Sequence, residues 1–594
     1  MNRSIFNRLA CLFCLQLPAT FLATAQHDLP HAIAPEERPL IPAYRDSRAG
    51  QGRGISTPPP FSVRTMAEWE EVQSVVIAWT SYPGILKQIV RNAQQECEVI
   101  IVCDTEAEVV AYLQGPGFGG PIADLSGITF LEAPFNSIWS RDYMSETIYK
   151  NEVDSLLLLD WIYNRPRPAD DAMSDVIGQA KNIAVYSTTQ APYDLVHTGG
   201  NFMSDGAGTA FSSELVLEEN GPSGQFNQTV RDEAGVDAIM QQFMGIQRYI
   251  KMSALPFDGI NHIDMHMKLL DEETLLVGEF PVGVSDGPQL ELNMAQIMAN
   301  ETSLFGDPYA MVRIPMPSSA GGNYPPDASY RTFANNLFLN RTVLVPTYRT
   351  EYDTTGLRIL REALPGYRIV GIDCDSEQNI ISQSGAIHCI TKTIGVADPL
   401  LIRHQRLRDT YETVVGYPVA AYMRHRSGMA AANLYWTTDT ANGFAAVPMV
   451  DQGNGNWEAS IPAQPANSSI FYYVQGIANS GKVQVRPMVA PEGWWRFRVL
   501  DINTSIATAM GPVIAEVFPN PTSSILMVTL DGVAGVRAEV FLTDALGRVV
   551  MTLHKGPLPA DRRIFADLSQ LAEAPYLLVV QTANGASSTR VLKR

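Results

Sequence analysis

The sequence predicts an α/β or α+β domain followed by two all-β units. From Met66 to about Arg403, helix-like and strand-like segments alternate. From His404 to about Leu500 the pattern changes to short alternating runs separated by Asn, Gly and Ser turns, which is typical of an antiparallel sandwich. Residues 517–594 form a second all-β pattern, opening with VFPNPTSS. A chain of 594 residues is also too long for one domain of roughly 100–200 residues.

The composition is that of an acidic globular protein. Apolar residues make up 46% of the chain and charged residues 18%, so a sizeable core can form. The formal net charge of −19 disfavours a nucleic-acid-binding surface and favours cationic ligands. No run beyond the N-terminus approaches the roughly 20 apolar residues of a membrane-spanning helix. We therefore expect neither nucleic acid as a partner nor a transmembrane helix.

The N-terminus is predicted to direct export. Two arginines precede an apolar stretch at residues 9–17, and Ala23, Thr24 and Ala25 fit the small-residue rule for signal cleavage. Residues 26–60 are rich in Pro, Arg, Glu and Gly. This composition predicts a pro-segment or an extended lead-in, not a packed unit.

Apolar periodicity predicts individual elements of the first domain. Helical spacing covers residues 84–97, 106–113 and 232–247, whereas residues 98–102 and 156–162 have the pattern of buried strands. We find no internal repeat by sequence identity.

Four cysteines remain after the predicted signal peptide: Cys97, Cys103, Cys374 and Cys389. Four in so long an exported chain do not make a disulfide framework. Cys97 and Cys103 lie at the two ends of one predicted strand, about 20 Å apart, so they cannot bridge each other. Free thiols in an exported protein suggest a nucleophile.

Cys389 is the best candidate for that nucleophile. It lies in QSGAIHCITKTIG, residues 383–395, where Gly385 and other small residues approach it and a Thr/Ile-rich run predicted to be a strand follows. A thiol after a Gly-containing turn can face a cavity. The alternative is a buried cysteine that packs as a small hydrophobe.

The stretch NHIDMHMKLLD, residues 261–271, offers an acid–base pair. On a helix, His262 and His266 would suggest a zinc pair, but the residues that follow favour a strand, a polar turn and a second strand. On a strand, His262, Asp264 and His266 point to one face and could move protons or bind a cation. The alternative is a solvated polar face, and no third ligand recurs at a zinc-like spacing.

NSIWSRDY, residues 136–143, could bind a planar cation, because it places Asp142 three residues after Trp139. The alternative is a structural ion pair between Arg141 and Asp142. Asn201 in HTGGN and Asn335 in FANN are candidate ligand contacts, although Asn near Gly is often turn chemistry.

Together these side chains suit attack on a guanidinium carbon. The substrate cation has a pKa above about 12, so it binds charged, and two carboxylates can hold it bidentately. A thiol of pKa about 8.5 becomes a nucleophile when a neighbouring cation stabilises its thiolate. Histidine then supplies the acid that expels ammonia.

The order of NSIWSRDY, DWIYNRPRP, HTGGN, NHID, FANN and SGAIHC resembles the guanidino-modifying superfamily. Within it, the chain is similar to secreted bacterial peptidylarginine deiminases, whose small-molecule relatives are agmatine deiminases. The resemblance covers about Met66 to Arg594, and it includes an immunoglobulin-like domain and a type IX secretion sorting domain.

The resemblance implies a role for each matching residue. Cys389 matches the nucleophile, His262 the general acid/base, and Asp142 and Asp264 the guanidinium-binding carboxylates. Asn335 matches the helper amide, with the adjacent Asn336 as an alternative. The resemblance also implies a five-fold pseudosymmetric α/β propeller, and neither a catalytic metal nor a cofactor.

These considerations predict a signal peptide, a lead-in, a catalytic domain, an immunoglobulin-like β-sandwich, a linker and a sorting domain, at residues 1–25, 26–60, 61–403, 404–502, 503–516 and 517–594. The expected partners are peptide or protein arginine and the outer-membrane secretion machinery. The expected location is outside the cell or on its outer surface, after passage through the periplasm.

A preference for C-terminal arginine is predicted from DWIYNRPRPADD, residues 160–171. Prolines stiffen this segment, so Arg165 and Arg167 project to the same side and can clamp a carboxylate. In the resembling family the matching pair holds the substrate's terminal α-carboxylate. The alternative is that Asp170 and Asp171 neutralise both arginines on a surface loop.

The predicted function is therefore an exported deiminase that converts peptide arginine to citrulline and ammonia through a cysteine thiouronium intermediate. One alternative is a small-molecule deiminase acting on agmatine or free arginine. Another is a non-catalytic surface adhesin, which would have no need of the Cys, His and Asp set.

Overall fold

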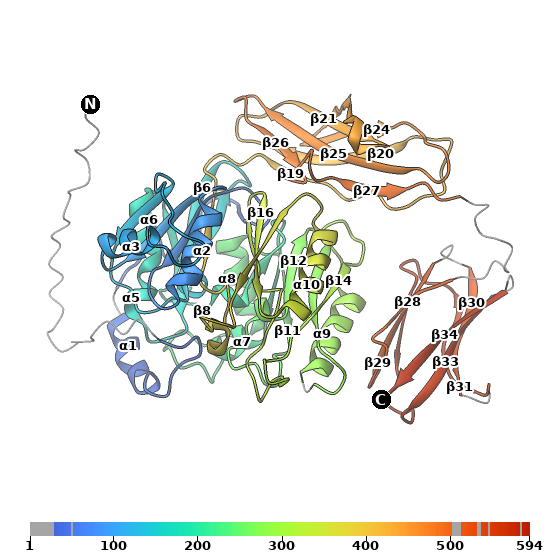
Figure 1. Ribbon diagram of the computed structural model, residues 1–594, viewed down its shortest axis with the longest axis horizontal. Coiled ribbons are helices and arrows are strands. Elements are labelled where there is room, and N and C mark those ends of the chain that lie inside the picture. Colours follow the sequence, from blue (N-terminus) through green and yellow to red (C-terminus); the bar gives the residue numbers. More distant parts are fainter. Residues whose placement is uncertain are drawn as a thin grey trace.

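The computed structural model (Figure 1) describes residues 29–594, apart from 49–50, 285, 502–512, 532–535, 545–546 and 583–584. The predicted signal peptide lies outside the described residues. Within them, no helix is both long and apolar enough to cross a membrane.

Five small sheets build the region between residues 63 and 395, and in each an antiparallel pair lies beside a parallel pair. The first two sheets contain β18 (Lys392–Gly395), β2 (Val72–Ala78), β3 (Glu98–Cys103) and β4 (Ile128–Glu132), and then β1 (Val63–Thr65), β5 (Glu146–Lys150), β6 (Ser155–Tyr163), β7 (Val185–Thr188) and β8 (Val196–His197). The other three contain β9 (Met203–Ser204), β10 (Thr209–Ser213) and β11 (Arg248–Met252); β12 (Met267–Asp271), β13 (Thr274–Glu279) and β14 (Ala310–Pro315); and β15 (Leu337–Leu339), β16 (Thr342–Thr347) and β17 (Arg368–Asp373). Among the described residues none of these sheets closes on itself, and the five-fold propeller stays a prediction.

Helices alternate with these strands, as expected for an α/β domain. They are α2 (Pro83–Ala93), α3 (Glu106–Leu113), α4 (Ser140–Tyr143), α5 (Pro168–Asp171), α6 (Met173–Lys181), α7 (Leu215–Asn220), α8 (Glu233–Met244), α9 (Gly287–Asn300) and α10 (Thr350–Ala363). The helices predicted from periodicity correspond to α2, α3 and α8, and the predicted strands to β3 and β6. Apolar side chains of these elements form three buried clusters, and the largest of them includes residues from Met66 to Ile390.

The last strand of this region pairs with its second strand. β18 runs antiparallel to β2, with Lys392 opposite Val76 and Thr393 opposite Val75. The strand predicted after Cys389 is therefore confirmed. Because β18 is fixed in the sheet, the turn before it, which carries Cys389, is held against the core.

Two β-sandwiches follow. The first pairs the sheet of β19 (Leu401–Arg403), β20 (Tyr417–Arg424), β24 (Asn456–Ile461) and β23 (Val450–Gly453) with that of β22 (Ala445–Pro448), β21 (Met429–Thr437), β25 (Ser469–Ala478), β26 (Val483–Arg486) and β27 (Trp495–Arg498). The second pairs β28 (Val513–Phe518), β29 (Ile525–Asp531) and β32 (Arg563–Asp567) with β31 (Val549–Pro557), β30 (Arg537–Thr543), β33 (Ala574–Thr582) and β34 (Gly585–Lys593). Figure 1 shows them in orange and red.

The N-terminal segment is packed, contrary to the expectation of an extended lead-in. A 3₁₀ turn, η1 (Arg38–Leu40), leads into α1 (Ile41–Arg48). Ile41 and Tyr44 of α1 are buried in a small apolar cluster with residues of β6, β8 and the 221–232 loop. The composition predicted an unpacked segment because Pro, Arg and Glu outnumber its apolar residues. The two that α1 buries, Ile41 and Tyr44, are three residues apart.

Candidate active site

Cys389 lies fully buried in the turn before β18, where its thiol has polar neighbours. The amide of Asn335 donates a hydrogen bond to its sulfur at 3.1 Å, and the thiol is 3.6 Å from Oδ2 of Asp264. Burial, and then the carboxylates of Asp264 and Asp142, raise the pKa of the Cys389 thiol well above its usual value. A thiol packed only as a small hydrophobe would have apolar neighbours. Cys97, Cys103 and Cys374 are also unpaired.

His262 and Asp264 come from a tight turn, not from a strand. The turn is a 3₁₀ helix, η3 (Ile263–Met265), and β12 begins only at Met267. The prediction that His262, Asp264 and His266 share one strand face is therefore wrong, because period-2 spacing cannot distinguish a strand from a short turn that precedes one. In this turn His262 lies 3.6 Å from Asp142 through its Nδ1. Burial lowers the pKa of His262 to about 4, so its imidazole is neutral at pH 7.

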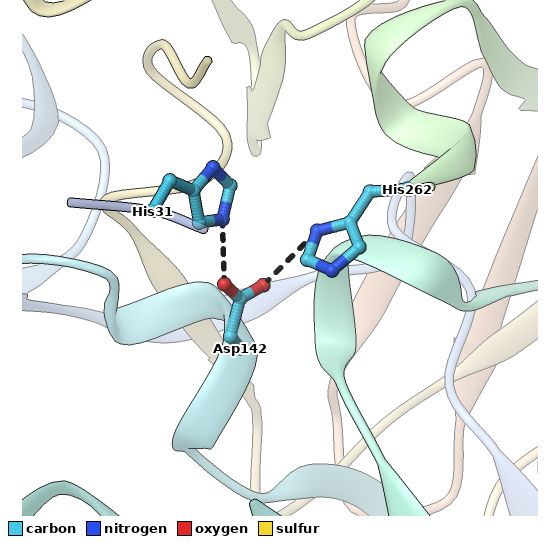
Figure 2. A group of neighbouring side chains, drawn as sticks. All are labelled: His31, Asp142 and His262. Carbon is cyan, nitrogen blue, oxygen red and sulfur yellow. Dashed lines mark hydrogen bonds and ion pairs between the residues drawn. The ribbon is translucent and has the colours of Figure 1, made fainter. Parts of the chain in front are cut away.

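Asp142 lies at the centre of the site, on the one-turn helix α4. Its Oδ2 accepts a 2.6 Å hydrogen bond from Nε2 of His31 (Figure 2), and its Oδ1 accepts one from the backbone of Gly200 at 3.2 Å. Burial would raise the pKa of Asp142, but the nearby imidazoles of His31 and His262 outweigh it and lower that pKa. The alternative pairing with Arg141 does not occur, because Arg141 lies against Glu68 and the carbonyl of His388.

Two residues that the sequence did not single out fix the position of Asp264: His388 contacts it directly, and Glu68 contacts His388. Nδ1 of His388 is 2.6 Å from Oδ2 of Asp264, and Nε2 of His388 is 2.7 Å from Oε1 of Glu68. Because both nitrogens face carboxylates, the ring satisfies both only as an imidazolium. Burial would raise the pKa values of Glu68 and Asp264, but their contacts with His388 help to lower both. His388 could have been suspected because it precedes Cys389, whereas no sequence signal marks Glu68.

Gly200 leaves the space in which these side chains meet. A Cβ atom there would lie 2.5 Å from Nδ1 of His262, 3.0 Å from Oδ1 of Asp142 and 3.3 Å from Oδ2 of Asp264. Real Cβ atoms essentially never lie as close to another heavy atom as the first of these distances, and the other two are tight. The contribution of the HTGGN motif to the site is therefore that Gly200 has no side chain, which lets His262, Asp142 and Asp264 lie close together.

The predicted amides have different environments. Asn335 bridges the site, because it also accepts a hydrogen bond from the backbone of His388 at 3.0 Å. Asn201 instead accepts one from the backbone of Ser213, and Asn336 donates one to the carbonyl of Phe333. Neither Asn201 nor Asn336 contacts Cys389 or the two aspartates in these hydrogen bonds, so their contacts are structural.

Trp139, Arg165 and Arg167 all contact the N-terminal segment. The indole of Trp139 stacks on His31 at 4.1 Å between ring centroids, with 10° between the planes. Arg165 donates to the carbonyl of His31 at 3.2 Å, and Arg167 binds both carboxylate oxygens of Glu37, at 2.6 and 2.9 Å.

The acidic residues beside these arginines have other partners. Asp170 accepts hydrogen bonds from Ser137 and the backbone of Asn136, and Asp171 pairs with Arg48 and Arg53. The two arginines are thus not paired with the neighbouring aspartates in a surface ion cluster.

His31, Asp142 and His262 could together be considered as metal ligands, since their ligand atoms lie within 4.8 Å of one another. Ligand atoms around a tetrahedral zinc ion are about 3.3–3.5 Å apart, given bonds of about 2.0–2.1 Å. His31 and Asp142 are closer, at 2.6 Å. This distance fits a hydrogen bond better than two ligands of one ion.

A buried thiol, two carboxylates and a neutral imidazole that lie close together form the site of a guanidino-modifying hydrolase. The comparisons agree, because residues 64–394 match the model of the Porphyromonas-type peptidyl-arginine deiminase family, and the chain belongs to that family. Residues 516–594 match the secretion system C-terminal sorting domain, as predicted. The chain is therefore exported, and is secreted or attached at the cell surface.

Several relatives are agmatine deiminases by description. One from Vibrio parahaemolyticus is 24% identical over 300 residues, which is 45% of this chain and 78% of the relative. One from Marinomonas sp. is 22% identical and covers 56% of this chain and 94% of the relative. The solved agmatine deiminase of Enterococcus faecalis superposes with a TM-score of 0.48 at 18% identity, covering 57% of this chain and 99% of that one.

Proposed function

We propose that this protein hydrolyses the guanidinium group of arginine in peptides, yielding citrulline and ammonia. The observation that carries the proposal is that His262, Asp142 and Asp264 meet beside Gly200, and that the thiol of Cys389 lies 3.6 Å from Asp264. Two anionic carboxylates beside a thiol suit a planar cation whose central carbon must be attacked.

In this mechanism the carboxylates bind first. Asp142 and Asp264, both with lowered pKa values, are ionised and hold the charged guanidinium. The cation also offsets the negative field that keeps the Cys389 thiol protonated, so thiolate forms where it is needed. Asn335 hydrogen bonds to the sulfur and orients it.

The thiolate then adds to the guanidinium carbon, forming a C–S bond. The neutral imidazole of His262 takes up the proton that the Cys389 thiol loses and passes it to the departing nitrogen, so ammonia leaves and an S-alkylthiouronium remains. Water adds to this carbon, His262 accepts its proton, and the C–S bond breaks to give citrulline and the free thiol. One water is consumed, and one ammonia is released.

Recognition of C-terminal arginine is the finer part of the proposal. Arg165 and Arg167 already bind a carbonyl and a carboxylate of the N-terminal segment. Both arginines can therefore receive the α-carboxylate of a terminal substrate residue, with bidentate geometry at a guanidinium.

The test compares a peptide that ends in arginine, its C-terminal amide, and agmatine. In protein freed of the N-terminal segment, which otherwise occupies Arg165 and Arg167, we expect kcat/KM to fall by about tenfold to a hundredfold on amidation, because an ionic hydrogen bond is lost. In Arg165→Ala the two peptides should differ much less, whereas Arg361→Ala, at an exposed position of α10, should behave as the wild type. Equal rates on both peptides, or faster turnover of agmatine, would favour a small-molecule deiminase.

A further inference from the structure

The segment from Leu29 to Arg48 lies across the candidate active site. Its first described residues run past Trp139 and the two arginines, and α1 anchors its other end. In Figure 2 the ring of His31 points at one oxygen of the Asp142 carboxylate, and the ring of His262 faces the other oxygen. A segment that composition predicted to be loose therefore contributes a side chain to the centre of the site.

His31 has the features expected of a bound guanidinium. It is planar, it stacks on the face of Trp139, and it donates a hydrogen bond to Asp142. Its other nitrogen is 2.8 Å from the carbonyl oxygen of Ser384. Since both nitrogens face oxygen acceptors, the ring satisfies both only as a cation.

The backbone of the same segment is held as that of a peptide substrate would be. Three consecutive carbonyls accept hydrogen bonds from side chains of the site: Leu29 from the indole of Trp139 at 2.9 Å, Pro30 from Arg167 at 2.6 Å and His31 from Arg165 at 3.2 Å. Three of the residues predicted to recognise substrate, Trp139, Arg165 and Arg167, are thus occupied by the segment.

Contacts farther along fasten the segment. The carboxylate of Glu37 forms a buried bidentate pair with Arg167. Ile41 and Tyr44 of α1 are buried among apolar residues, and Arg48 pairs with Asp171. Hydrophobic burial stabilises the attachment of α1, and the Glu37–Arg167 pair fixes the position of the segment beside the site.

The consequence is a sealed site. Cys389, His262 and Asp264 are 0% exposed and Asp142 is 1% exposed. A substrate guanidinium cannot reach the thiol while His31 occupies this position, and the carboxylate that would hold the substrate is already paired with a cation.

We propose that residues 29–48 are an intramolecular inhibitor in which His31 takes the place of the substrate arginine side chain. Displacement of the segment, most simply by endoproteolysis between α1 and β1, would activate the enzyme. None of residues 51–60 in that connection is buried, so a protease can reach it. Unlike a loop lid, this device acts once, because a cleaved segment can be lost.

The first test uses full-length His31→Ala and Glu37→Gln, with Glu36→Gln as the matched control. Glu36 is the exposed neighbour of the buried Glu37. The readout, which does not depend on turnover, is the rate at which chloroacetamidine alkylates Cys389, located by peptide mass spectrometry. We expect labelling about tenfold faster in both variants than in the wild type or the control, because the open state becomes more populated.

The second test places a site-specific protease sequence between Gln51 and Gly52. Cleavage should raise both Cys389 labelling and citrulline release, and adding a synthetic peptide of residues 28–48 should reverse both. The same peptide with alanine in place of His31 should inhibit at least about tenfold more weakly.

The possible outcomes separate the inhibitor from the proposed deimination. The inhibitor rests on the proposed function only for its biological role. Faster labelling without citrulline release would support the inhibitor and defeat the deimination. Equal labelling in wild type, His31→Ala and Glu37→Gln would overturn the inhibitor, and so would lower turnover in His31→Ala, which would make His31 part of the catalytic machinery. Activation of the wild type by a chelator alone would overturn a direct His31–Asp142 lock in favour of a bound cation.

Discussion

Replacing Gly200 with alanine adds one methyl group where His262, Asp142 and Asp264 meet. The new Cβ would lie 2.5 Å from Nδ1 of His262, against an ordinary contact of about 3.5 Å. His262 must therefore retreat by roughly 1 Å, and the oxygen of Asp142, at 3.0 Å, by about half as much. The substitution leaves the side chains of His262, Asp142 and Asp264 in the protein and changes only their positions.

This displacement should affect catalysis more than stability. A misplacement of about 1 Å in reacting groups can cost about a hundredfold in rate. Overpacking a buried site costs about 1–3 kcal/mol. We therefore expect kcat/KM of Gly200→Ala to fall about a hundredfold on an arginine peptide, while the protein still unfolds cooperatively at a moderately lower temperature.

The assay measures citrulline release in a His31→Ala background, so that the N-terminal segment does not mask the effect. Gly259→Ala is the matched control, because a Cβ there meets no atom within 4 Å. Activity of Gly200→Ala within about threefold of the control would refute the convergence of these three side chains. Loss of cooperative unfolding would instead show that the substitution disturbs the fold.

Two further predictions concern the thiol and the C-terminal domain. Because burial, with Asp264 and Asp142, raises the pKa of the Cys389 thiol well above its usual value, alkylation of the intact protein should keep rising beyond pH 9. A plateau below pH 8 in the intact protein would contradict the raised pKa. A chain ending at Leu500 should retain Cys389 labelling but fail to leave the periplasm, measured by cell fractionation; normal secretion of that chain would contradict a sorting role for residues 516–594.

Local periodicity predicted much of the fold. The helix at 106–113 and the strand at 98–102 are correct to within a residue, because their apolar positions repeat clearly and cap or turn residues flank them. The spacing could not reveal which strands pair, since β18 joins β2 across most of the domain. It also failed at residues 262–266, where a two-residue period arises from a 3₁₀ turn.

The site residues could be predicted where a reactive residue type occurs in an uncommon local sequence pattern. A lone thiol after a glycine turn, and a tryptophan near an aspartate, stand out in any chain. Glu68 does not, because an exposed-looking glutamate is common and only the fold brings it to His388. His31 was overlooked for a related reason: it lies in a Pro-rich segment, and burial of such a segment depends on a surface built by residues far away in the chain.

The pairing of β18 with β2 also bears on when this protein can react. Lys392 pairs with Val76, so the thiol of Cys389 is fixed only after the two ends of a region of more than 300 residues have met. Such distant contacts form late in folding. During synthesis, the ribosome must have released nearly the whole of that region before any ordered thiol exists. Fragments that end before β18 lack the β18–β2 pairing that orders Cys389. Interrupted translation therefore gives chains without the assembled site inside the cell.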